Sequence, residues 1–93
     1  MFVSLAPQRV KHDSGYIVQT GGRYALQYIY RDVFAEVEAD FATVTGVYSD
    51  TLFIRRGDGP PENPSPEERN LILTRILSAL DFWGMKHEIC SRK

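Results

Sequence analysis

The chain has 93 residues, of which 43% are hydrophobic, 12% aromatic and 25% charged. A chain of this length buries about two-thirds of its unfolded surface in one core, so we expect a single domain spanning residues 1–93. Its apolar content exceeds that of disordered chains, which lack the side chains needed to offset the entropy of ordering. Eleven basic and twelve acidic residues give a formal net charge of −1. No overall field therefore draws the chain to nucleic acid, and we expect no nucleic-acid partner.

Three further features bear on the location of the protein. Cys90 is the only cysteine, so no internal disulfide can form, which suits a reducing cytoplasm. The opening segment MFVSLAPQRV has neither the basic start nor the roughly 7–15-residue apolar stretch of an export signal. No apolar run approaches the ~20 residues of a membrane span. We therefore expect a cytoplasmic protein without a membrane partner.

The first half of the chain has the residue pattern of an antiparallel sheet. Residues 16–20 (YIVQT) and 23–30 (RYALQYIY) are rich in β-branched and aromatic side chains and flank Gly21-Gly22. Two glycines readily supply the positive φ values of a tight hairpin turn. In residues 33–44, apolar and polar side chains alternate, which predicts a strand with one buried and one solvated face.

Turn-forming residues separate the elements that follow, up to residue 64. Gly46 and the Ser49-Asp50 pair indicate a bulge or a turn before a short strand at residues 51–56. Residues 57–64 (GDGPPENP) hold three prolines and two glycines, which predict a connector between sheet and helix. Residues 2–5 are a candidate edge strand beside the four strands of this meander.

The start of a helix is the strongest local signal in the chain. Ser65 can cap the helix, Pro66 suits its first turn, and Glu68 completes a Ser-x-x-Glu capping box. Gly84 can end it in a left-handed conformation. Residues 85–90 (MKHEIC) alternate again and are a candidate last strand. Between the caps, apolar residues recur at helical spacing, at Ile72, Leu73, Ile76, Leu77, Leu80 and Trp83.

These elements predict an α+β fold. We expect a mostly antiparallel β-meander sheet of four to six strands, with one long amphipathic helix at about residues 65–83 packed on one face. The order of the segments leaves open which face of the sheet the helix covers.

Metal or thiol chemistry would have to use His12, His87 and Cys90, which are the only strong nitrogen and sulfur donors. His87 and Cys90 are three residues apart on a predicted strand, so their side chains should point to opposite faces. They should therefore neither share a metal ion nor act as nucleophile and base. We expect no catalytic residue, no metal and no cofactor.

Three acidic residues, Glu36, Glu38 and Asp40, alternate along the predicted strand at residues 33–44. Neighbours in such a row lie roughly 6–7 Å apart on one face of a sheet. A solvated row of this kind titrates normally, whereas acid–base catalysis needs a carboxyl whose pKa is raised by burial. The row is either a solvated sheet face or an acidic docking surface for a basic partner.

Tyr24, Tyr28 and Tyr30 should project to one side of the preceding strand, together with Leu26. If that side faces the helix, the tyrosines belong to the core. If it faces away, they form an exposed aromatic band of the kind that anchors protein interfaces. The sequence is compatible with both the core position and the exposed band.

Three stretches carry a resemblance to a known family: GYIVQTGGRYALQYI, the alternating AEVEADFA and the helical SPEERNLILTRILSALDFWG. Across roughly residues 15–90 the chain resembles the small α+β immunity proteins of bacterial polymorphic and contact-dependent toxin systems. The resemblance implies a cytoplasmic protein that has no enzymatic activity and neutralises a cognate toxin by tight binding. Our hypothesis is that the three acids and three tyrosines named above bind a basic toxin domain.

Two other functions remain open. The chain could be a structural or regulatory module that self-associates through its aromatic face or an open sheet edge, so either a monomer or a homodimer is expected. It could also be a small enzyme or ligand-binding domain, which would need a pocket between helix and sheet lined by convergent polar groups.

Overall fold

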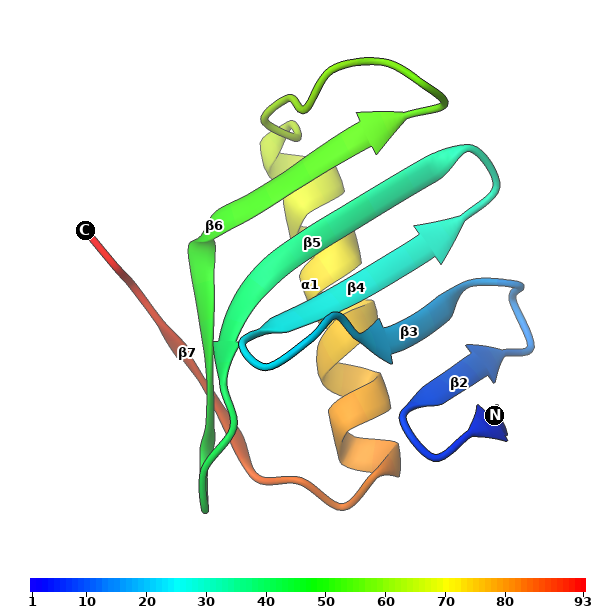
Figure 1. The fold of residues 1–93 in the computed structure, drawn as a ribbon, viewed down its shortest axis with the longest axis vertical. Coiled ribbons are helices and arrows are strands. Elements are labelled where there is room, and N and C mark those ends of the chain that lie inside the picture. The colour runs from blue at the N-terminus through cyan, green and yellow to red at the C-terminus, as the bar shows by residue number, and fades with distance from the viewer.

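The computed structural model describes residues 1–93 and contains one seven-stranded sheet whose strands lie in the order of the chain (Figure 1). Strands β1 to β6 form an antiparallel meander, and β7 pairs with β6 in parallel. The bounds are β1 Phe2–Ala6, β2 Arg9–His12, β3 Ile17–Thr20, β4 Ala25–Tyr30, β5 Val33–Asp40, β6 Thr45–Arg56 and β7 His87–Cys90.

The expected fold class is wrong in its strand number, its strand direction and its shape. The sheet has seven strands instead of four to six, it is mixed, and it curls into a half-barrel. Strand β2 (RVKH) buries only Val10, so its alternation is too short to be recognised in the sequence. Strand β7 returns through a helix to the edge of the sheet, and such a crossover joins parallel strands.

The curl of the sheet is concentrated where β5 meets β6. Glu36 pairs with Phe53 and Glu38 pairs with Tyr48, so four residues of β6 lie opposite one residue of β5. The Thr51 hydroxyl holds this bulge: it accepts the backbone N–H of Glu38 at 2.9 Å and donates to the Tyr48 carbonyl at 2.7 Å. Figure 1 shows β6 turning sharply at this point. The turn signals before residue 51 therefore mark a bulge inside one long strand.

Helix α1 (Pro66–Phe82) is shorter than the expected span, because Ser65 and Trp83 are its caps. The Ser65 hydroxyl accepts the backbone N–H of Glu68 at 3.2 Å, which is one half of a capping box. The Glu68 carboxylate instead accepts Arg56 Nη2 at 2.6 Å, so it ties the start of the helix to the end of β6. The helix is neither long nor apolar enough to cross a membrane.

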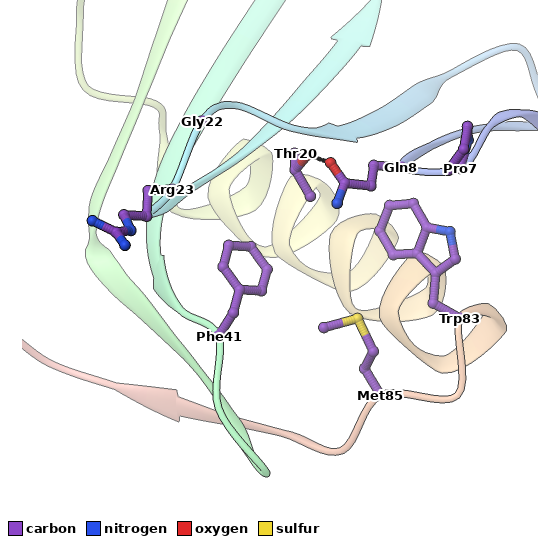
Figure 2. Close-up of a pocket in the computed structure, with 8 residues that line it drawn as sticks. All are labelled: Pro7, Gln8, Thr20, Gly22, Arg23, Phe41, Trp83 and Met85. Carbon is purple, nitrogen blue, oxygen red and sulfur yellow. Dashed lines mark hydrogen bonds between the residues drawn. The ribbon is translucent and has the colours of Figure 1, made fainter.

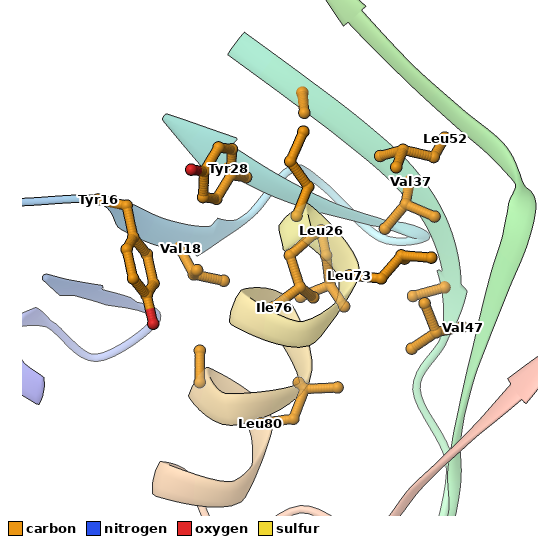
Figure 3. Packing of buried hydrophobic residues seen from close by; sticks show 14 of the residues in the cluster. Tyr16, Val18, Leu26, Tyr28, Val37, Val47, Leu52, Leu73, Ile76 and Leu80 are labelled. Carbon is orange, nitrogen blue, oxygen red and sulfur yellow. The ribbon is translucent and has the colours of Figure 1, made fainter. Parts of the chain in front are cut away.

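The helix lies in the concave face of the sheet (Figure 1), and the core fills the space between them (Figure 3). Ile76, Ala79 and Leu80 are fully buried there. They meet alternate side chains of the strands, because every second residue of a strand points to the same face. The sheet contributes Val10, Val18, Leu26, Tyr28, Ala35, Val37, Ala39, Val47, Leu52 and Ile54.

The connector between sheet and helix is attached to the sheet. Glu62 and Ile54 exchange two backbone hydrogen bonds, of 2.9 and 2.8 Å, and form an isolated antiparallel bridge. The Glu62 carboxylate also lies 3.4 Å from Arg56 Nε. Residues 57–64 therefore fold back along the end of β6 before the helix begins.

Replacing Ile76 by alanine should lower the free energy of unfolding by about 2–5 kcal/mol, because this side chain is fully buried between helix and sheet. The matched control is Leu71→Ala on the same helix, where the side chain is 49% exposed and the loss should stay below about 1 kcal/mol. Urea unfolding measures both. Equal losses would mean that the helix is packed on a different face.

Candidate functional site

The convex side of the sheet, which faces away from α1, is not covered by any element of the chain (Figure 1). We call it the open face. Strand pairing places two rows of side chains across it, one mainly apolar and one mainly polar. The apolar row consists of Lys11, Ile17, Ile29, Phe34 and Arg55, and the polar row of Arg9, Gln19, Gln27, Glu36 and Phe53.

The polar row is joined by side-chain hydrogen bonds. Gln19 Nε2 donates to Gln27 Oε1 at 2.7 Å, and Gln27 Nε2 donates to Glu36 Oε2 at 2.9 Å. Each amide is thereby fixed in one orientation, and the Glu36 carboxylate has a neutral partner. The centre of the open face is therefore a preorganised polar strip beside half-buried Ile17, Ile29 and Phe34.

The three predicted acids lie on the open face but differ in their partners. Glu38 binds the guanidinium of Arg92, whose Nε is 2.8 Å from Glu38 Oε1. Arg92 also lies over the ring of Tyr48, with its central carbon 3.9 Å from the ring centroid. Asp40 is exposed at the end of β5 and forms no ion pair. Glu36 and Asp40 form no ion pair within the chain.

The predicted tyrosines are divided between the two faces of the sheet. Tyr24 is 58% exposed and lines a hollow of about 270 Å³ on the open face, together with Glu36 and Glu38. Tyr28 is 2% exposed and Tyr30 is half-buried, and both lie on the helix side. The expectation that all three share a side is wrong for Tyr24, which precedes β4 in the hairpin turn.

Tyr28 and Tyr30 surround the guanidinium of Arg75 on the helix. Arg75 Nη1 donates to the Tyr28 hydroxyl at 2.7 Å, and Arg75 lies 5.2 Å from the ring centroid of Tyr30 and 4.7 Å from that of Tyr16. Burial raises the pKa of the Tyr28 hydroxyl, although the hydrogen bond from Arg75 opposes the shift. The hydroxyl stays neutral at physiological pH, and the cluster joins helix to sheet.

The histidines and the cysteine are not brought together. The His12 ring stacks on Tyr16 with a centroid distance of 4.8 Å, and His87 Nε2 lies 2.8 Å from Asp81 Oδ1. Desolvation and the nearby Glu88 carboxylate raise the pKa of the Cys90 thiol. No group of three or more histidine, cysteine, aspartate or glutamate side chains could hold a metal ion.

The largest cavity, about 530 Å³, lies at one end of the half-barrel near the end of α1 (Figure 2). The sequence patterns did not reveal it, because it is assembled from four separate turns. The only signal was three large apolar side chains just outside the regular elements, Phe41, Trp83 and Met85. The remaining lining residues are Pro7, Gln8, Thr20, Gly22 and Arg23.

The geometry thus defines a sheet protein with one filled face, one open face and a cavity at one end. Comparison with protein-family models, curated proteins and solved structures found no match to this chain. Its function is therefore inferred from the chemistry of these two surfaces.

Acidification should release the last residues of the chain from Asp50. The backbone N–H groups of Arg92 and Lys93 donate to its carboxylate at 3.1 and 3.0 Å, and the bond from Arg92 is the largest cause of a lowered Asp50 pKa. A lowered pKa means that the contact is fully present above the ordinary value of about 3.9 and is lost as pH falls through the lowered value.

In an acid titration followed by NMR, the amide signals of Arg92 and Lys93 should move together with a midpoint below about 3.9. The Asp50→Asn variant is the control and should lack this transition. A midpoint at or above the ordinary value would contradict the observed hydrogen bonds.

Proposed function

We propose that this chain is a non-enzymatic binding protein, an immunity protein that neutralises a cognate bacterial toxin in the cytoplasm by tight protein–protein binding. The observation that supports this proposal is the open face, where apolar side chains and a fixed polar strip lie side by side with nothing packed over them. The resemblance of the strand and helix pattern to immunity proteins supports the same function.

The apolar row suits the centre of a protein interface. Ile17, Ile29 and Phe34 are adjacent across three strands, because Ile17 pairs with Ile29 and Ile29 pairs with Phe34. Interfaces bury such a patch and surround it with polar groups. The fixed amides of Gln19 and Gln27 provide that border at little further cost in side-chain entropy.

Charges on the open face are separated along β5. Lys11 and Arg55 lie in the row of Phe34 near the start of the strand, whereas Glu36 and Asp40 lie further along it. On the acidic side, Arg9 lies three strands away from Glu36 in the same row, and Arg92 binds Glu38. A partner with a basic patch opposite the acids would be attracted and oriented by this arrangement, because complementary charges speed encounter and set the binding pose. The acids and Tyr24 therefore remain the proposed contact for a basic toxin domain.

Self-association is the alternative that a specific observation favours. Val3 and Leu5 on the edge strand β1 are 57% and 51% exposed, and β1 carries no charged side chain that would discourage pairing. Light scattering distinguishes this alternative, since a dimer whose population rises with concentration and falls in Val3→Lys would support it.

Replacing Glu36, Glu38 and Asp40 together by lysine should abolish protection against a cognate toxin domain. Reversing three interfacial charges should weaken binding by about a hundredfold or more, since like charges then oppose each other. Growth of cells that co-express the toxin domain measures protection, and calorimetry with an inactivated toxin domain measures affinity.

The matched control replaces Asp32, Asp58 and Glu67 by lysine, which changes the net charge equally but lies outside the open face. Equal effects of the two triple variants would reject the open face as the contact surface. Absence of binding by the unaltered chain would reject the proposed function itself.

A further inference from the structure

One acid of the open face already holds an arginine of the same chain. Glu38 Oε1 accepts hydrogen bonds from Arg92 Nε, at 2.8 Å, and from Arg92 Nη2. The central carbon of the Arg92 guanidinium lies over the Tyr48 ring, 3.9 Å from its centroid. Glu38 and Tyr48 are paired across β5 and β6, so their side chains share the open face. A carboxylate and an aromatic ring therefore bind one guanidinium together.

The segment that carries Arg92 is fixed to the sheet by Asp50. The Asp50 carboxylate accepts the backbone N–H groups of Arg92 and Lys93 at 3.1 and 3.0 Å, and it accepts the Ser91 hydroxyl at 3.2 Å. We call residues Ser91–Lys93 the strap. All three are exposed, and the Arg92 side chain is 51% exposed. Arg92 can therefore leave Glu38 without opening the core.

The surface around Arg92 keeps an excess of negative charge. Asp40 and Glu88 both pair with Gly46 on adjacent strands, so they lie on the same face as each other. Neither forms an ion pair, and Arg92 neutralises only Glu38. A second cation that approaches this part of the open face would therefore be attracted while Arg92 is still bound.

The contacts of Arg92 favour arginine over lysine. A planar guanidinium can lie on an aromatic ring while its N–H groups donate to a carboxylate, whereas an ammonium is a strongly hydrated point charge. An exposed ion pair of this kind is weak. An arginine that is held in place by the rest of a bound partner can therefore replace Arg92.

We propose that Glu38 and Tyr48 form an arginine-binding site for a partner protein, and that Arg92 occupies this site until an arginine of the partner displaces it. The identity of the partner rests on the proposed function, since a basic toxin domain would supply the arginine. In the free chain the strap covers the site and competes with every basic ligand. The site itself is defined by the contacts of Arg92 alone.

The peptide acetyl-Ser-Arg-Lys-amide copies the strap and serves as a probe that needs no toxin. An NMR titration that follows the Tyr48 ring signals measures its affinity for the full chain. The variant Arg92→Gln should bind this peptide about three- to tenfold more tightly than the unaltered chain, because the competing guanidinium is gone. The matched control is Lys93→Gln, which removes the same charge from the strap and should bind the peptide as the unaltered chain does.

The peptide acetyl-Ser-Lys-Lys-amide tests the preference for a guanidinium. It should bind Arg92→Gln at least about threefold more weakly than the arginine peptide does. Equal affinities of the two peptides would overturn the proposal. So would equal affinities of Arg92→Gln and Lys93→Gln for the arginine peptide, because general charge would then explain the binding.

This proposal and the proposed function fail separately. If the peptides bind with the expected preferences but the unaltered chain binds no toxin domain, the toxin is rejected as the partner and the arginine site is supported. If the chain binds a toxin domain but the arginine peptide leaves the Tyr48 signals of Arg92→Gln unchanged, the arginine site is rejected and the proposed function is supported.

Discussion

The packing of α1 into the concave face of the sheet is the interaction on which the rest of the structure depends. Ile76 and Leu80 exclude water from Leu26, Val37 and the other inward side chains, and this burial supplies most of the favourable free energy of folding. Because side chains alternate along each strand, the same packing assigns every second residue to the opposite side. The composition of the open face follows from what the helix covers.

The bulge between β5 and β6 is the second constraint, because it lets a single sheet wrap around one helix. Extra residues in β6 increase the local twist and bend the strand, and Thr51 satisfies the backbone groups that lose their partners there. The bend also carries β6 toward β7, which completes the half-barrel. The cavity lies at the end of this half-barrel, where the helix has ended and only turns close the structure.

The two surfaces differ in the ligands they suit. The open face is broad, with separated charges and a strip of fixed amides, which are properties of a surface for another protein. The cavity is concave and small, with an apolar floor and a few polar side chains around it, which are properties of a small-molecule site.

Local chemistry determined what the sequence alone could predict. The Ser65 cap, the Gly21-Gly22 hairpin and the alternation of residues 33–40 act through neighbouring residues, and each lies in the corresponding element. Long-range packing decided the rest. Four features depend on it: the parallel pairing of β7, the burial of Tyr28 against Arg75 of the helix, the pairing of Glu38 with Arg92, and the cavity. Each joins residues far apart in the chain. No local pattern encodes such contacts, because they exist only once the helix has covered one face of the sheet.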